Sequence, residues 1–226
     1  MKTYKFGINV TTYNRYKYLL STLESLKKTI FLPDTVLIIT DDNSQEQDTI
    51  NYLKNYNIEN ENIKIRKIFN ESNLGSKDNY HKSLLSFIDE DVDFIVNIDS
   101  DCLLNKQWLL KINELINEFD DNIICSSFCC KYHFGNPNNK LEIIKEKYYE
   151  RDTLNGMGIC FPKKILHEFY NHSPLHFDGY LCHDLKNRYK MRCICTSISY
   201  MQHIGAYGVH SNPHAYDCSD NFIGEN

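Results

Sequence analysis

The chain has 226 residues, 42% of them hydrophobic, and a net charge of −5 at neutral pH. This length and apolar content suit one folded domain, and we expect a single domain over residues 1–226. The 25 basic residues are scattered rather than clustered, which argues against nucleic acid as a partner. Neither a signal peptide nor a run of about 18 apolar residues is visible, so we expect a cytoplasmic protein without a membrane span.

Short apolar runs alternate with helical patterns through the first half of the chain. Strands are expected at residues 6–11, 36–40, 63–69 and 94–98, and helices at residues 18–26, 49–56, 80–88 and 108–119. Strands that alternate with helices at this spacing indicate parallel βαβ units with right-handed crossovers. We therefore predict an α/β fold with a Rossmann-like, mostly parallel sheet that is flanked by helices.

The pattern becomes mixed after Asp120. An apolar run covers residues 123–130, helices are expected at residues 163–170 and 183–189, and a strand is expected near residues 194–200. We predict that residues 1–101 form the parallel half of the domain and that residues 102–226 form a mixed α+β half packed on it.

The nine cysteines do not indicate a disulfide framework. Their number is odd, and no secretion signal points to an oxidising compartment. The chain also lacks the Cys-x-x-Cys pairs that are typical of structural zinc sites. We therefore expect reduced thiols.

Polar side chains follow each of the four expected parallel strands. They lie at residues 11–15 (TTYNR), 41–44 (DDNS), 70–75 (NESNLG) and 99–101 (DSD). Ligands of an open parallel sheet bind at the carboxyl ends of its strands, where these residues meet. Two of the four ends carry paired acids, so this edge should be acidic and should attract a cation.

Asp99 and Asp101 form the most informative acidic pair. Residues i and i+2 of an extended chain project to the same side, so both carboxylates can face one divalent cation that bridges to phosphate oxygens. A solvated turn is the alternative for any single Asp-x-Asp. Here the pair directly follows an apolar strand at residues 94–98, which favours a binding site.

Together these motifs resemble the glycosyltransferases of family 2, which have the GT-A fold. The resemblance rests, in chain order, on VTTYNR (10–15), DDNS (41–44), NLG (73–75), DSD (99–101), GMG (156–158) and HDL (183–185). It implies a nucleotide-binding half at residues 1–101 and an acceptor-binding half at residues 102–226. The implied reaction moves a sugar from a nucleotide-sugar, with UDP-sugars as the expected donor class, to a hydroxyl of a glycan or protein-linked acceptor.

The resemblance also implies roles for single residues at the strand ends. Asp42 would accept a hydrogen bond from the base, Gly75 and Lys77 would approach the nucleotide or its phosphates, and Asp99 would hold the ribose or the sugar. The complete set expected to contact the nucleotide-sugar is Thr11, Tyr13, Arg15, Asp42, Asn73, Gly75, Lys77, Asp99 and Ser100.

A divalent cation, Mn²⁺ or Mg²⁺, is expected with Asp99, Asp101 and His203 as its ligands. His203 lies in QHIG, which resembles a late histidine ligand of some GT-A enzymes, and imidazole beside carboxylates favours Mn²⁺. A histidine that is hydrogen-bonded at a strand end is the alternative interpretation. His210 and His214 could take its place as ligands.

Asp184 is the expected catalytic base of an inverting direct displacement. It follows His183, where relatives often have Glu. Because Asp184 is expected at the start of a helix, an N-cap role is the alternative, and Asp178 is the next candidate for the base.

Two other functions fit parts of the pattern. A nucleotidyltransferase of related fold would need a glycine-rich basic loop after the first strand, and VTTYNRYKYLL contains no glycine. A noncatalytic carbohydrate-binding protein would keep the fold without turnover. Measured donor hydrolysis or transfer separates it from an enzyme.

Overall fold

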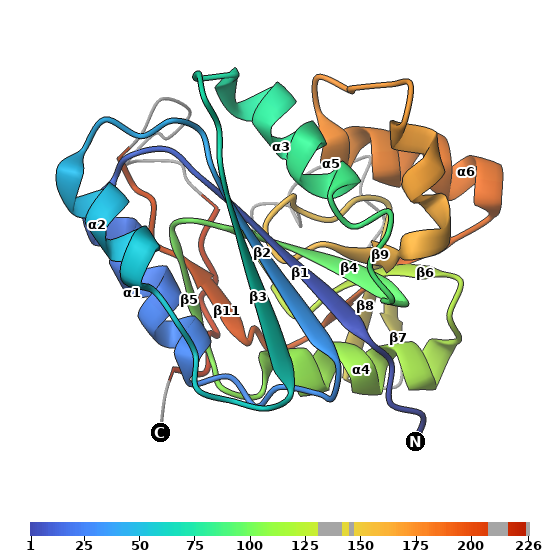
Figure 1. Cartoon of the computed structure of the whole chain (residues 1–226). Coiled ribbons are helices and arrows are strands. Elements are labelled where there is room, and N and C mark those ends of the chain that lie inside the picture. Colours follow the sequence, from blue (N-terminus) through green and yellow to red (C-terminus); the bar gives the residue numbers. More distant parts are fainter. Residues whose placement is uncertain (131–141, 145–146, 208–216, 225–226) are drawn as a thin grey trace.

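The computed structural model describes residues 1–130, 142–144, 147–207 and 217–224 (Figure 1). Its strands are β1 (Phe6–Thr12), β2 (Thr35–Asp41), β3 (Ile63–Phe69), β4 (Phe94–Asp99), β5 (Cys102–Leu104), β6 (Ile123–Ser126), β7 (Glu142–Ile144), β8 (Tyr148–Arg151), β9 (Cys160–Pro162), β10 (Arg192–Thr196) and β11 (Met201–His203). Within this part of the chain, nine strands form one sheet in the order β3-β2-β1-β4-β9-β6-β10-β8-β7, and β5 and β11 form a separate ribbon.

The half of the sheet that comes from the first hundred residues is parallel. β1 pairs in parallel with β2 and β4, and β2 pairs in parallel with β3. Beyond β4, β9 is antiparallel to both of its neighbours, β6 and β10 are parallel, and β8 and β7 are antiparallel. The predicted α/β fold with a parallel first half and a mixed second half is confirmed.

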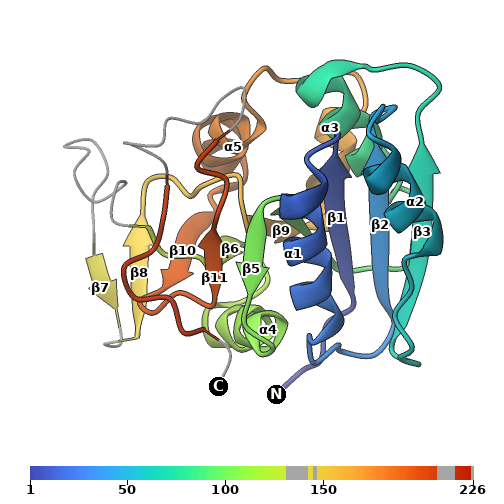
Figure 2. The same ribbon diagram turned by 90° about the vertical axis from the view of Figure 1, so that its left-hand side faces the viewer.

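Helices cover both faces of the sheet (Figure 2). α1 (Tyr16–Lys27), α2 (Gln47–Asn55) and α4 (Trp108–Phe119) contribute to one hydrophobic cluster. α3 (Gly75–Leu85) and the helical turns at Lys163–Phe169 and Tyr180–Leu185 contribute to the second. Because β1, β2 and β4 lie between two helical layers and are buried on both sides, their sequences are largely apolar, whereas the edge strand β3 (IKIRKIF) is only partly buried.

The two faces of each strand can be assigned from these clusters. In β2, Leu37 and Ile39 pack with the α1 side, whereas Val36 and Ile38 pack with the α3 side. This alternation follows from the two-residue period of a strand. Gly7 of β1 is on the α3 side of the sheet, where an added Cβ would lie 2.6 Å from the ring of Phe87, just past the end of α3. The glycine therefore leaves room for this ring against the sheet.

Three expected elements differ from the observed ones. α3 begins at Gly75 and not at the predicted residue 80. The prediction is late because the first turn of the helix is polar and carries no apolar signal. The strand expected at 194–200 is two strands, β10 and β11, separated by a bend. The helix expected at 183–189 continues a helical segment that starts at α5 (Phe177–Gly179), passes through a π-helical turn at Tyr180–Leu185 and ends in α6 (Lys186–Tyr189).

Asp184 therefore lies within a helical segment and not at its start, so the N-cap interpretation of this residue is wrong. Its neighbours on the inner side of the segment, Leu181 and Leu185, are fully buried, while Asp184 itself is exposed. The segment is anchored by these leucines and presents Asp184 outward.

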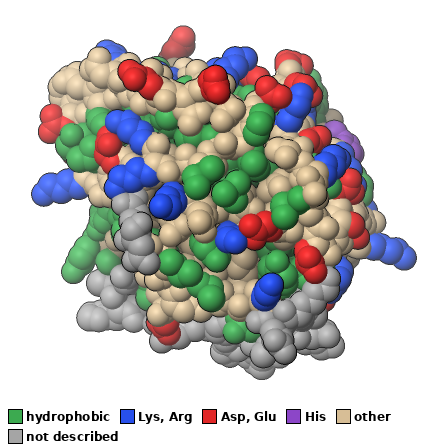
Figure 3. All heavy atoms as spheres, turned by 90° about the horizontal axis from the view of Figure 1, so that it is seen from below, with side chains coloured by type: hydrophobic (Ala, Val, Ile, Leu, Met, Phe, Trp, Pro, Cys, Tyr) green, Lys and Arg blue, Asp and Glu red, His purple; other side chains and the backbone are tan. Residues whose placement is uncertain are grey.

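The state of the cysteines, the helix lengths and the surface charges can be compared with the expectations from composition. All nine cysteines are free thiols, as expected, and all but Cys218 are buried. None of the described helices has the length and apolar character needed to cross a bilayer. On the face shown in Figure 3, Lys and Arg side chains are interspersed with Asp and Glu. His210 and His214 lie outside the described residues.

Candidate active site

The first two loops at the carboxyl edge of the sheet are tied to each other. The side-chain oxygen of Asn14 accepts hydrogen bonds from the backbone N–H groups of Gln45 (2.8 Å) and Glu46 (3.0 Å), and the Asn14 N–H donates to Ser44 Oγ (2.7 Å). Asn14 and Arg15 both have left-handed backbone angles, with φ of 51° and 60°. This conformation is uncommon for Arg, and it fixes the direction in which the Arg15 side chain leaves the loop.

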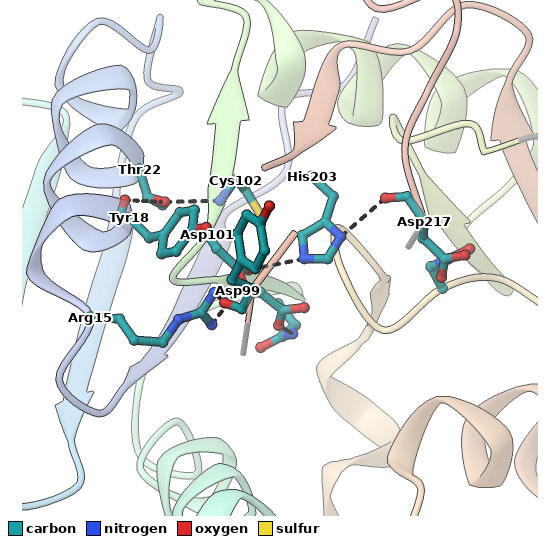
Figure 4. Close-up of polar contacts among 11 residues, drawn as sticks. Arg15, Tyr18, Thr22, Asp99, Asp101, Cys102, His203 and Asp217 are labelled. Carbon is teal, nitrogen blue, oxygen red and sulfur yellow. Dashed lines mark hydrogen bonds and ion pairs between the residues drawn. The ribbon is translucent and has the colours of Figure 1, made fainter. Parts of the chain in front are cut away.

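Arg15 reaches across the edge to the DSD motif (Figure 4). One guanidinium nitrogen lies 2.8 Å from Asp101 Oδ2, and another donates to the carbonyl oxygen of Tyr207 at 2.8 Å. The guanidinium also lies over the Tyr18 ring, 4.5 Å from its centroid. Arg15 therefore joins three segments of the chain at one point.

Asp101 lies between two basic groups and is only 6% exposed. His203 Nε2 is 3.3 Å from Asp101 Oδ1, on the opposite side from Arg15. Burial alone would raise the pKa of Asp101, but His203 and Arg15 outweigh it and hold the pKa of this carboxyl below its usual value. Asp101 is therefore an anion at neutral pH.

His203 reaches Asp101 because β11 pairs with β5, with His203 opposite Cys102. Helix α1 holds β5 in place, since Thr22 Oγ1 accepts a hydrogen bond from the Cys102 N–H at 2.9 Å. The other ring nitrogen, Nδ1, lies 3.1 Å from the carbonyl oxygen of Asp217. Burial alone would lower the pKa of His203, but the partner carboxylate of Asp101 outweighs it and raises that pKa.

Gly205 lies against the Asp101–His203 pair. A Cβ added to Gly205 would overlap the Asp101 carboxylate and would lie 2.9 Å from His203 Nε2. The backbone is close here because the Ile204 N–H donates to the Asp101 carbonyl oxygen at 2.8 Å. Only glycine leaves room for both side chains at this position.

Asp99 is the second acid of the motif and is partly buried. Burial raises its pKa to about 6, and the charge of Asp101 adds to the rise. Asn97 donates a hydrogen bond to Asp99 Oδ1 at 2.9 Å. Asp99, Asp101 and His203 thus influence one another electrostatically. Nevertheless, the described part of the chain contains no group of three His, Cys, Asp or Glu side chains with the geometry of a metal site.

Asp42 organises the turn before α3. It is 2% exposed and accepts hydrogen bonds from Asn70 Nδ2 and from the backbone N–H groups of Leu74 and Gly75, each at 2.9 Å. Gly75 has φ of +81° with open space around its Cα, so glycine is favoured there by conformation. The Gly75 N–H also donates a hydrogen bond to the side-chain oxygen of Asn73 at 3.0 Å. Both carboxylate oxygens of Asp42 therefore already accept hydrogen bonds from the protein itself.

The other expected contacts lie at the same edge of the sheet. Thr11 is the register partner of Asp99 on the neighbouring strand. Tyr13 is 44% exposed, Lys77 is exposed in the first turn of α3, and Ser100 is partly buried between the two acids. The structure therefore brings the predicted set to one edge of the sheet.

The two candidates for the catalytic base are placed differently. Asp184 is exposed, and no hydrogen bond or ion pair joins it to a described residue. Asp178 lies close to the Gly156 backbone, 3.7 Å from the position of an added Cβ, and its charge contributes to the raised pKa of Asp99. The geometry therefore favours Asp178 as the carboxylate nearer to the DSD motif.

Two side chains beside Asp99 were not foreseen from the sequence. Tyr80 stacks on Phe177, with ring centroids 4.0 Å apart, and its buried hydroxyl has no hydrogen-bond partner among the described residues. Burial raises the pKa of Tyr80 well above its usual value, and Asp99 and Asp178 add to the rise. Asn97 is fully buried in β4. Its only signal in the sequence is that it interrupts the apolar run FIVNI.

The sequence of residues 8–171 matches the family model described as Glycosyl transferase family 2. The chain belongs to this family. A sequence search among curated proteins finds no match. The match covers the DSD motif, both loops tied by Asn14, and the turn organised by Asp42.

Solved structures of TarS from S. aureus share the fold of this family 2 protein. TarS 1–349 has a TM-score of 0.64 at 19% identity, over 89% of this chain and 61% of that one. The same TarS fragment in complex with UDP-GlcNAc gives 0.62 at 21% identity, over 91% and 62%, and its complex with UDP gives 0.59 at 20%, over 87% and 59%. The present chain thus spans about three-fifths of TarS 1–349, and the GT-A fold expected from the motifs is confirmed.

Proposed function

We propose that this protein transfers a sugar from a nucleotide-sugar, with UDP-sugars as the donor class, to a hydroxyl of a glycan or protein-linked acceptor. The observation that carries the proposal is the meeting of Arg15, Asp99, Asp101 and His203 at the carboxyl edge of a parallel sheet. Membership of family 2 supports the reaction class, and the UDP and UDP-GlcNAc complexes of TarS support the donor class.

The diphosphate of the donor would lie between Arg15 and the first turn of α3. Arg15 presents a planar fork that suits phosphate oxygens. The N-terminus of an α-helix favours anions because its first backbone N–H groups have no partner within the helix, although at α3 those of Leu74 and Gly75 already donate to Asp42. Lys77 lies in this turn, and Asp42 holds the turn in place through Leu74 and Gly75. These contacts orient the leaving group.

We include a divalent cation, Mn²⁺ or Mg²⁺, in the proposal, with Asp101 and His203 as ligands and Asp99 beside them. Carboxylate oxygens and an imidazole nitrogen are donors that suit such an ion. His203 directs Nδ1 to the Asp217 carbonyl and Nε2 to Asp101, which is the arrangement typical of a metal-bound histidine. A cation at Nε2 would take the place of the proton that Asp101 favours there. When bound, it would neutralise charge that develops on the leaving diphosphate.

A carboxylate would take the proton of the acceptor hydroxyl. As that oxygen forms a bond to the anomeric carbon, the bond from this carbon to the diphosphate oxygen breaks, and the nucleoside diphosphate leaves. A single displacement of this kind inverts the anomeric configuration. The resemblance assigns the base to Asp184, whereas the position of Asp178 beside Asp99 and Gly156 supports Asp178.

A binding panel tests the proposal directly. Nucleoside diphosphates and UDP-sugars are added with Mn²⁺, with Mg²⁺ or with EDTA, and thermal unfolding is followed. A ligand at about 100 times its Kd stabilises a protein by about 2.7 kcal/mol, and a domain of this size then gains about 5–10 °C in Tm. UDP release from UDP-sugars measures turnover. If no nucleoside diphosphate raises the Tm under any condition, the proposal is wrong.

A further inference from the structure

Two asparagines lie in the middle of the parallel sheet, where apolar residues are the rule. Asn9 of β1 and Asn97 of β4 are register partners, and both are 0% exposed. Their neighbours along each strand, Ile8 and Val10 in β1 and Val96 and Ile98 in β4, pack into the cluster on the α1 side. The two asparagines therefore face α3.

A chain of hydrogen bonds runs through this interface to the candidate active site. Thr40 Oγ1 and Ser83 Oγ of α3 are 2.7 Å apart, and Ser83 donates to Asn9 Oδ1. Asn9 Nδ2 donates to Asn97 Oδ1 at 3.1 Å. Asn97 Nδ2 then donates twice, to Asp99 Oδ1 at 2.9 Å and to the Gly156 carbonyl oxygen at 3.1 Å.

The last contacts of this hydrogen-bond network, to Asp99 and Gly156, indicate its role. Burying amides in a layer that apolar side chains could fill brings no gain in stability, because hydrogen bonds only offset the cost of burial. The hydrogen-bond network instead fixes the orientation of the Asp99 side chain. Asp99 is two residues from Asp101, whose like charge acts on it. The Asn97 amide fixes the position of Asp99 Oδ1 at 2.9 Å, and Oδ2 would then remain for a ligand.

We infer that Asn97 is a positioning residue that orients Asp99 and the Gly156 carbonyl for the donor, with Asn9 holding Asn97 in turn. The inference rests on the proposed function. Ser83 contacts Asn9 and does not contact Asn97, so it lies at the end of the network that is remote from Asp99.

The test replaces the paired asparagines so that stability and positioning separate. Asn97→Leu alone leaves Asn9 without its acceptor and should unfold at a lower temperature. Asn9→Val combined with Asn97→Leu removes both amides, and such joint apolar replacement can be nearly neutral for stability. Ser83 and Thr40 still bond to each other in this double variant. Ser83→Ala is the matched control, because it breaks the network at its far end but keeps both Asn97 contacts.

We expect the double variant to unfold within a few degrees of the unmodified protein, yet to bind UDP in the presence of Mn²⁺ about 10-fold more weakly. Its kcat/KM for release of UDP from a UDP-sugar should fall about 100-fold, as for misplaced catalytic contacts. Its crystal structure should show Asp99 turned from its present position. Ser83→Ala should lose thermal stability while its UDP affinity stays within twofold.

Two outcomes count against the inference, and they can be told apart. If the double variant binds UDP as tightly as the unmodified protein and Asp99 keeps its orientation, the network is only structural, and the proposed function stands. If the unmodified protein binds neither UDP nor any UDP-sugar, the proposed function fails and the inference fails with it.

Discussion

Gly205→Ala is the smallest change that should disturb the centre of the candidate site. The added methyl would overlap the Asp101 carboxylate and would lie 2.9 Å from His203 Nε2. Asp101 cannot turn aside freely, because it is buried and held by Arg15 at 2.8 Å and by His203 at 3.3 Å. Overpacking a filled interior costs about 1–3 kcal/mol, and this corresponds to a Tm lower by about 2–12 °C for a domain of this size.

The assay combines thermal unfolding without nucleotide and calorimetry of UDP with Mn²⁺. We expect Gly205→Ala to lose both stability and most of its cation-dependent UDP affinity, since the methyl displaces a proposed ligand. Gly179→Ala is the control, because its added Cβ would come no closer than 3.7 Å, to His176. Alanine there is compatible with a helix and should leave Tm unchanged or slightly higher. A Gly205→Ala protein with unchanged Tm and UDP affinity would refute the steric argument.

Three further predictions concern single side chains. Asp101→Ala should abolish the difference in UDP affinity between Mn²⁺ and EDTA, which calorimetry measures; equal affinity in both conditions for the unmodified protein would remove the metal from the mechanism. Tyr80→Phe should leave Tm unchanged or raise it, because the hydroxyl has no partner among the described residues, whereas Tyr56→Phe loses a bond to a backbone carbonyl and should lower Tm. Asp178→Asn and Asp184→Asn should both keep the fold, and the one that removes the base should reduce transfer by about 10² to 10⁴. If both variants are as active as the unmodified protein, both assignments are wrong.

The parallel half of the fold could be predicted from sequence because its signals are local. Apolar runs such as residues 94–98 are long enough to mark a strand, and strand-helix alternation fixes the order of connections. The predicted start of α3, at residue 80, is too late because the first turn of the helix carries no apolar signal. This turn, from Gly75 to Asp78, is mostly exposed and is held by Asp42 rather than by apolar packing.

The contacts within the site could not be predicted, because they depend on pairings between distant residues. His203 reaches Asp101 only through the register of two three-residue strands, β5 and β11, that lie about a hundred residues apart. The direction of Arg15 depends on two consecutive left-handed residues, and no propensity rule places Arg in that conformation. The motifs predict which residues lie at the carboxyl edge of the sheet. Which of these side chains contact one another depends on tertiary packing.

The position of Arg15 bears on how cation and nucleotide would bind. Asp101 Oδ2 lies 2.8 Å from the Arg15 guanidinium, and a divalent ion at the same carboxylate would be repelled by this second positive charge. A donor diphosphate offers Arg15 another anion, so binding of the nucleotide would release Asp101 for the cation. The other guanidinium contact, to the Tyr207 carbonyl oxygen, would be lost in the same step. If the proposed cation and nucleotide bind in this way, they would be coupled to the segment around Gly205 through the Arg15 side chain, and each would favour the binding or the rearrangement of the others.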